Sequence, residues 1–261
     1  MGKIVAIANQ KGGVGKTTTA INLAASLAVL ERKVLLVDFD PQANSTSGLG
    51  ISPETSPNIY ECIAGDTPLE EAIRPTNTPN LDIIPSHIDL VGAEIELVSR
   101  LRREFVLRDL LQGLEEAYDF ILIDCSPSLG LLTINALTAA EKVIIPIQCE
   151  IFALEGLGKL KSTIQLVTDQ LNPQLHIDGI LISMYDRRLR LGKMIVQQIK
   201  SSVPDFVYET IIHRNSKITE APSVGQPVIM YDAGCKGSDN FMKLAAEFLD
   251  RNKEEEVHPV P

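Results

Sequence analysis

The chain has 261 residues, of which 44% are hydrophobic and 5% aromatic, with no tryptophan, which suits an aliphatic sheet covered by helices and a single sizeable α/β core. The net charge of −10, from 24 basic and 34 acidic residues, argues against a broadly basic nucleic-acid-binding protein, although average charge says little about one face. No window is apolar and long enough to span a bilayer, and four cysteines without a CxxC pair indicate neither a zinc site nor a disulfide framework.

Apolar runs that predict strands alternate with helical patterns along the whole chain. The predicted strands are Ile4–Ala8, Val34–Val37, Leu81–Pro85, Phe120–Asp124, Val143–Ile147, Ile177–Met184, Val207–Ile212 and a short Val228–Met230. The predicted helices lie near residues 16–30, 87–99, 105–117, 130–140, 153–171, 191–201, 216–224 and 236–252, and residues 41–80 are expected to be a mobile loop with a short helix. Fully apolar strands between helices predict an α/β fold, with a doubly wound, mainly parallel sheet flanked by helices.

A glycine-rich segment follows the first predicted strand and leads directly into the first predicted helix. Residues 9–18 have the sequence NQKGGVGKTT. Glycines let successive backbone N–H groups turn toward phosphates, and the helix N-terminus adds its positive dipole end. In such a P-loop Lys16 reaches the β- and γ-phosphates and the Thr17 hydroxyl ligates Mg²⁺. The predicted binding residues are Lys11, Gly12, Gly13, Val14, Gly15, Lys16, Thr17 and Thr18.

The loop departs from the usual P-loop pattern in two ways. Gln10 stands where that pattern has glycine, and an extra lysine, Lys11, opens the loop. The dinucleotide-binding pattern GxGxxG does not fit, because Thr18 occupies the place of its last glycine. A second similar segment, residues 156–159, lies in a helical run and lacks the Ser or Thr that would hold a metal, so we interpret it as helix surface.

Aspartates lie at or just beyond the ends of two predicted strands, and ligands of such sheets bind beyond the carboxyl ends of the strands. Asp124 is predicted to hold Mg²⁺ through a water, completing the metal site that Thr17 begins. Asp40 is predicted to orient the attacking water. Asp38 is predicted to take part in the reaction directly or to support the other two aspartates. The alternative is that these aspartates only cap the helices that follow them.

With these features the chain resembles the ParA/Soj partition ATPases, within the MinD/ParA group of deviant Walker-type proteins. The similar segments are residues 8–19, 36–42, 44–50, 123–129, 184–186, Arg214 and Asn215, and residues 220–222, and the resemblance extends from residue 3 to about 250. It implies that ATP-bound subunits close face to face into a homodimer and that Lys11 of one subunit reaches the phosphates held by the other. Lys11, Lys16, Asp40 and Asp124 are then the catalytic residues, with ATP and Mg²⁺ as cofactors.

Two positions depart from the pattern of the family. Ser126 stands where the family often has the first of two prolines after the aspartate, and His213 replaces a frequent proline before Arg214. The segment that holds His213 and Asn215 lies beside adenine in relatives, so both are predicted to contact the base.

The chain differs from other members of the group. MinD-like relatives end in a basic amphipathic helix that docks on membranes, whereas residues 253–256 are KEEE, so no membrane partner is expected and the last helix is expected to pack on the core. Cluster-carrying relatives use cysteines to ligate iron–sulfur clusters. In this chain only Cys125 is predicted to lie near the nucleotide, and we interpret it as a buried structural thiol. Partition proteins with a helix-turn-helix need about a hundred residues before the P-loop, and this chain has ten.

A local basic cluster is the candidate DNA-binding surface. Its residues are Arg187, Arg188, Arg190 and Lys193, with Lys217, and in ParA/Soj relatives the basic residues that align with Arg188 and Lys217 bind DNA non-specifically. The alternative is a solvated helix start. An ATP-closed dimer would join two such clusters into one stripe.

The resemblance thus implies a cytoplasmic, nucleoid-associated partition ATPase with a slow basal rate, stimulated by a ParB/Spo0J-like protein, that binds double-stranded DNA non-specifically. Residues 1–250 are expected to form a single P-loop ATPase domain, followed by a flexible acidic tail at 251–261. The alternatives are a MinD-like spatial regulator on a membrane or protein scaffold and a cluster-carrier ATPase.

Overall fold

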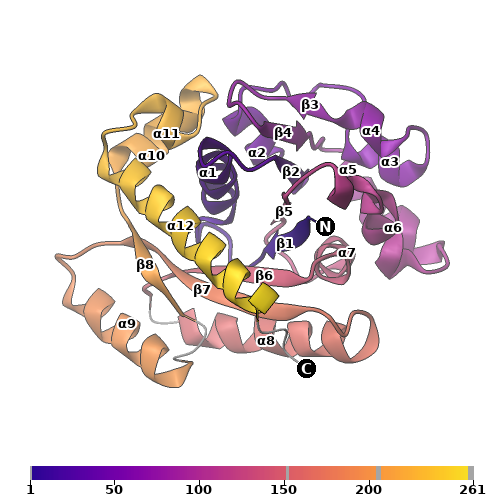
Figure 1. Cartoon of the computed structure of the whole chain (residues 1–261). Coiled ribbons are helices and arrows are strands. Elements are labelled where there is room, and N and C mark those ends of the chain that lie inside the picture. Colours follow the sequence, from indigo (N-terminus) through magenta and orange to yellow (C-terminus); the bar gives the residue numbers. More distant parts are fainter. Residues whose placement is uncertain (1, 151–152, 204–206, 258–261) are drawn as a thin grey trace.

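The computed structural model describes residues 2–150, 153–203 and 207–257. In these residues one sheet has the strand order β3-β4-β2-β5-β1-β6-β7-β8, and every pair is parallel except β3–β4. The strands are β1 Lys3–Ile7, β2 Val34–Phe39, β3 Arg74–Pro75, β4 Leu81–Ile84, β5 Phe120–Cys125, β6 Lys142–Gln148, β7 His176–Tyr185 and β8 Val207–His213. The predicted doubly wound, mainly parallel sheet is confirmed (Figure 1).

Helices cover both faces of the sheet (Figure 1). One face packs against α1 (Lys16–Val29), α11 (Val228–Tyr231) and α12 (Lys236–Val257). The opposite face packs against α3 (Ile59–Ala64), α4 (Leu69–Ala72), α5 (Leu90–Glu96), α6 (Val106–Leu111), α7 (Leu131–Ala139), α8 (Ala153–Gln170) and α9 (Arg190–Ser202). The short helices α2 (Asn44–Gly48) and α10 (Ser216–Glu220) follow β2 and β8.

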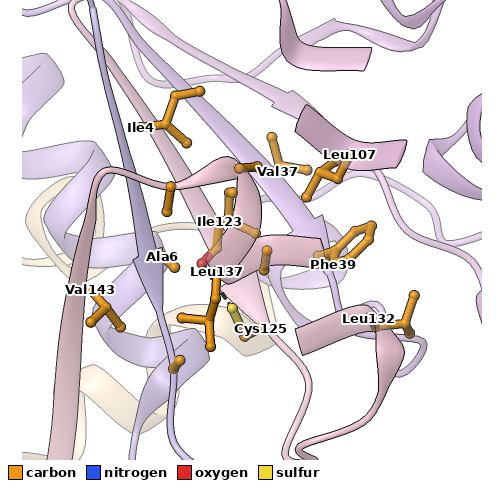
Figure 2. Close-up of a cluster of buried hydrophobic side chains, with 14 of the residues drawn as sticks. Ile4, Ala6, Val37, Phe39, Leu107, Ile123, Cys125, Leu132, Leu137 and Val143 are labelled. Carbon is orange, nitrogen blue, oxygen red and sulfur yellow. Dashed lines mark hydrogen bonds between the residues drawn. The ribbon is translucent and has the colours of Figure 1, made fainter. Parts of the chain in front are cut away.

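The alternation of side chains along β1 explains why this strand is apolar throughout. Ile4 and Ala6 belong to the core cluster on one face, whereas Val5 and Ile7 belong to the cluster on the other. Figure 2 shows the first cluster, in which Ile4 and Ala6 lie among side chains from β2, β5, α6 and α7. A central parallel strand must therefore supply an apolar side chain at every position, which is the pattern that the sequence shows.

The predicted strand at residues 228–230 is wrong, because this segment is the helix α11. Pro227 precedes the helix, and the backbone N–H of Val228 donates to Asn22 Oδ1 at 2.7 Å instead of to a neighbouring strand. A run of three apolar residues carries no periodicity, so tertiary contacts decide its conformation.

Residues 41–80 contain more regular structure than the sequence predicts. Helices α2, α3 and α4 and the edge strand β3 all lie in this segment. Asn58 begins α3 with a capping box, in which its side chain accepts the Tyr60 N–H at 3.0 Å and Glu61 accepts the Asn58 N–H at 2.7 Å.

The last helix packs on the core, as predicted. Phe241, Leu244 and Phe248 are fully buried, and the ring of Phe248 meets that of Phe120 edge to face with centroids 5.1 Å apart. Helix α12 continues to Val257, further than the predicted end at residue 252. Among the described helices, none is long and apolar enough to cross a membrane.

Candidate nucleotide site

The glycine-rich loop joins the end of β1 to the start of α1. Gly13 and Gly15 have φ angles of 73° and 90°, which side chains with a Cβ rarely adopt, and Gly15 precedes the first turn of α1. No atom lies within 4 Å of where a Cβ of Gly13 would stand, so the loop faces open space there. The backbone is thus shaped to turn N–H groups toward an anion.

Neighbouring strands hold this loop in place. Asn9 Nδ2 donates to the Pro146 carbonyl at 2.8 Å, and Asn9 Oδ1 accepts the Lys11 N–H at 3.0 Å. The Ser183 hydroxyl, from β7, donates to the Val14 carbonyl at 2.6 Å. Protein contacts therefore hold the loop in place, and such preorganisation reduces the entropy lost on binding.

Lys16 lies inside the loop. It is buried, and its Nζ donates to the Lys11 carbonyl at 3.3 Å. Burial lowers the pKa of Lys16, and the negative charges of Asp124 and Asp40 oppose that shift. A buried ammonium group with few partners is a strong site for a phosphate oxygen.

Asp124 lies at the end of β5, next to the end of β1, where it is paired in register with Ile7. It is fully buried, and its Oδ2 accepts the Ser45 hydroxyl at 2.7 Å. Burial raises the pKa of Asp124, and the side chains of Ser45 and Thr17 oppose this rise. The structure therefore brings the two predicted metal-site residues, Thr17 and Asp124, together.

Asp38 and Asp40 lie beside Asp124. In the β2–β5 pair Asp38 is directly opposite Asp124. Burial and the charge of Asp124 raise the pKa of Asp38, whose Oδ2 accepts both the backbone N–H and the hydroxyl of Thr46 at 2.7 Å. Asp40 is also buried, and its Oδ1 accepts the Gln42 N–H at 3.0 Å, so it shapes the turn after β2.

This cluster fits a magnesium ion. Asp124 Oδ1 is buried and has no hydrogen-bond partner among the described atoms, although the other oxygen is satisfied. The carboxyl groups of Asp124 and Asp40 lie near the buried ammonium of Lys16, Asp38 lies opposite Asp124 on the neighbouring strand, and a divalent cation would offset their charge. Mg²⁺ takes one or two protein oxygens and fills its shell with water and phosphate, so Thr17 and Asp124 would hold it.

Lys11 differs from Lys16 in its surroundings. Its side chain is 45% exposed, and its Nζ forms an ion pair with Glu150, the second residue after the end of β6. The loop therefore directs one lysine inward and one outward.

A pocket of about 450 Å³ continues from the loop toward β8. Gly15 and Thr18 line it together with His213 and Asn215, so the structure joins the P-loop to both residues predicted to contact a base. The Asn215 side-chain oxygen accepts the Lys217 N–H at 2.8 Å and caps α10, which leaves the amide NH₂ as the group for a base edge. Gly12 lies at the opposite end of the loop. A Cβ built on Gly12 would stand 3.9 Å from the Cβ of Pro127.

The predicted DNA residues occupy two segments near this pocket. Arg187, Arg188, Arg190 and Lys193 are exposed on the turn after β7 and the first residues of α9. Two of the basic residues have local partners: Arg188 makes a bidentate pair with Asp186, at 2.6 Å for the shorter contact, and Lys217 pairs with Glu220 at 2.9 Å. Lys217 and Glu220 are both exposed, and a pair of that kind contributes little stability, whereas Arg188 is exposed but its partner Asp186 is only 15% exposed.

The sequence reasoning missed several residues that support the site. Asn9 and Ser183 fix the loop, Ser45 and Thr46 hold the aspartates, and Glu150 pairs with Lys11. Ser45 and Thr46 belong to one of the segments that carry the resemblance, so that signal was present. Glu150 and Ser183 have no local pattern that would mark them.

Comparisons with known proteins agree with this geometry. A family model described as an AAA domain matches residues 2–177. The chain is 50% identical to the chromosome partitioning protein ParA of Myxococcus xanthus over 97% of this chain and 89% of that protein. It is also 50% identical to the sporulation initiation inhibitor protein Soj of Bacillus subtilis, over 95% of this chain and 98% of the relative.

Solved structures share the whole fold. Cobyrinic acid a,c-diamide synthase of Mycobacterium smegmatis, solved with ADP and magnesium, superposes with a TM-score of 0.83 at 36% identity, covering 97% of this chain and 96% of the other. The septum site-determining protein MinD of Pyrococcus horikoshii, complexed with Mg-ADP, gives 0.81 at 31% identity, covering 95% and 96%. From the near-complete match to ParA and Soj, together with the loop and its aspartates, the chain belongs to the ParA/Soj family of partition ATPases.

Proposed function

We propose that this chain hydrolyses ATP with Mg²⁺ to segregate a chromosome or plasmid. ATP-bound subunits close face to face into a homodimer, the dimer binds double-stranded DNA without sequence preference, and hydrolysis releases it. The single observation that carries the proposal is the pair of loop lysines, because buried Lys16 serves the subunit's own phosphates while Lys11, which is half-exposed and paired with Glu150 at the surface, reaches those of a second subunit.

Each residue of the site has a role in this cycle. Lys16 and the loop N–H groups bind the triphosphate, and Thr17 and Asp124 hold the metal, which supplies charge neutralisation at the phosphates. Asp40 orients the attacking water. Lys11, delivered across the dimer interface, stabilises the charge that develops during phosphoryl transfer and so makes dimer formation depend on the γ-phosphate.

The proposed cycle has two partners, DNA and a ParB/Spo0J-like protein. Arg187, Arg188, Arg190, Lys193 and Lys217 contact DNA phosphates, so the protein associates with the nucleoid. A ParB/Spo0J-like protein stimulates hydrolysis. The acidic overall charge suits a basic segment of such a partner, and relatives named for chromosome partitioning support the assignment.

Retention of the Asp40→Ala variant on non-specific duplex DNA tests this function, with ATP against ADP over a salt series. We expect retention with ATP alone, lost as salt rises, because counterion release drives phosphate binding. An ATP dimer seen by light scattering that retains no DNA would contradict the proposal. Binding of that dimer to vesicles or to a protein scaffold would then favour a MinD-like spatial regulator.

A further inference from the structure

A second hollow adjoins the nucleotide pocket. It has a volume of about 580 Å³ and lies where the end of β8, the turn after β7 and the first half of α12 meet. Its charged lining residues are Arg187, Glu209, Lys236, Asp239 and Lys243, and His213 completes the wall. We call this the basic hollow.

The charges in the basic hollow do not cancel. Glu209 already pairs with Lys200 at 3.0 Å, and Asp239 pairs with Lys243 at 2.8 Å. Arg187 and Lys236 have no carboxylate partner among the described residues. Two uncompensated cations therefore face one concave surface, which favours an anion there.

His213 fixes the position of Arg187. Arg187 Nε donates to His213 Nε2 at 3.0 Å, and because a guanidinium can only donate, Nε2 must be the unprotonated nitrogen. The proton is then on Nδ1, which donates to Asn240 Oδ1 at 3.1 Å, and the same oxygen accepts the His213 backbone N–H at 3.1 Å. This chain of bonds leaves the terminal NH₂ groups of Arg187 as donors for a ligand.

The same histidine also lines the nucleotide pocket. It is the last residue of β8, next to Arg214 and Asn215, and the ring of Tyr185 packs edge-on against it with centroids 5.6 Å apart. His213 therefore lines both the space for the nucleotide and the basic hollow. Proline, which the family often has at this position, offers no acceptor for Arg187.

We propose that the basic hollow binds a backbone phosphate of duplex DNA and that His213 is the positioning residue that presents Arg187 to it. This inference rests on the proposed function. Planar guanidinium donors suit two oxygens of one phosphate, and exposed Arg190 and Lys193 on the adjoining α9 would continue along neighbouring phosphates. The basic hollow thus extends the DNA surface to Lys236, a residue outside the predicted cluster.

A double-mutant cycle tests this pairing. The full-length protein, closed with a non-hydrolysable ATP analogue, is titrated against a fluorescent duplex of random sequence over a salt series. The variants are Arg187→Ala, His213→Ala and the combination, with His213→Gln as the conservative replacement that keeps an acceptor. Arg190→Ala is the matched control, because it removes an exposed arginine of the same cluster that has no contact with His213.

We expect Arg187→Ala to weaken DNA binding about tenfold and to reduce the salt slope of the dimer by about 2, one phosphate contact for each subunit. His213→Ala should weaken binding in the wild type but not in Arg187→Ala, whereas its effect should multiply with that of Arg190→Ala. His213→Gln should recover part of the loss, and Lys236→Ala should lower the salt slope as Arg187→Ala does.

The inference is overturned if Arg187→Ala and Lys236→Ala leave the affinity and salt slope unchanged, or if the effects of His213→Ala and Arg187→Ala multiply. Either result, with a wild-type dimer that still binds DNA, leaves the proposed ATP-dependent DNA binding intact, and the first removes Arg187 from its contacts. A wild-type dimer that forms but binds no DNA overturns both. If His213→Ala fails to fold, His213→Phe, which keeps a ring but has no acceptor for Arg187, replaces it in the cycle with and without Arg187→Ala.

Discussion

Lys11 and Glu150 form an ion pair although 139 positions separate them in the chain. Lys11 opens the glycine-rich loop, and Glu150 follows β6. In the proposed dimer Lys11 must leave this carboxylate to reach the phosphates of the second subunit, so Glu150 competes with dimer formation. Each side chain is 45% exposed, and exposed pairs contribute about 0–1 kcal/mol.

Glu150→Gln should therefore strengthen the ATP dimer by up to about 30-fold, because each of the two subunits loses a pair worth up to about 1 kcal/mol that holds Lys11 in the monomer. Sedimentation equilibrium with a non-hydrolysable ATP analogue measures the change. Glu155→Gln is the control, since it breaks an exposed pair with Lys159 on α8 and does not involve Lys11. A weaker dimer in Glu150→Gln would mean that Glu150 serves the closed state instead.

The two loop lysines should separate in their effects. Lys16→Ala should abolish ATP binding, because the buried ammonium is the cation inside the loop. Lys11→Ala should bind a fluorescent ATP analogue with near wild-type affinity and remain monomeric. Normal ATP-dependent dimerisation of Lys11→Ala, measured by light scattering, would exclude its role across the interface.

Asp40→Ala should close with ATP and stay closed, because the variant loses the group that orients water while the loop, Lys16 and Asp124 remain. Single-turnover hydrolysis should fall by about 100-fold or more, with little change in nucleotide affinity. Gln42→Ala is a suitable control, since the Gln42 side chain takes no part in the bond between its N–H and Asp40. Loss of ATP binding in Asp40→Ala would instead assign this residue to the binding of nucleotide or metal.

A buried ion pair far from the loop should matter for stability alone. Lys142 and Asp178 are paired at 3.2 Å with 1% exposed side chains, and the Tyr208 hydroxyl also donates to Asp178. Lys142→Met should lower the free energy of unfolding by about 3–5 kcal/mol, because it leaves a buried carboxylate without its countercharge. Urea denaturation measures this loss.

The comparison variants for that pair are Lys159→Met and the double variant Lys142→Met with Asp178→Leu. Lys159 makes only an exposed pair with Glu155, so its loss should cost less than about 1 kcal/mol. The double variant should recover much of the stability, since no buried charge remains uncompensated. Equal effects of Lys142→Met and Lys159→Met would show that the buried pair is not needed for stability.

Local chemistry explains which parts of the fold were predictable. The apolar runs of β1, β2 and β5 predict central strands because both faces of such strands are buried. The phosphate loop is recognisable from Gly13, Gly15 and Lys16. The helix α11 was mistaken for a strand, because Pro227 and a bond from Val228 to Asn22 decide its conformation and three apolar residues do not.

By itself, the sequence determined the parallel α/β fold, the phosphate loop with its two lysines, and the aspartates at the strand ends. These features depend on neighbouring residues and on the alternation of strands and helices along the chain. Only the tertiary structure decided that Ser45 donates a hydrogen bond to Asp124 and that Thr46 donates one to Asp38. It also decided that Glu150 pairs with Lys11 and that His213 accepts a hydrogen bond from Arg187. Those contacts join segments 8 to 139 residues apart, and their geometry exists only after the sheet has brought the ends of its strands to one edge.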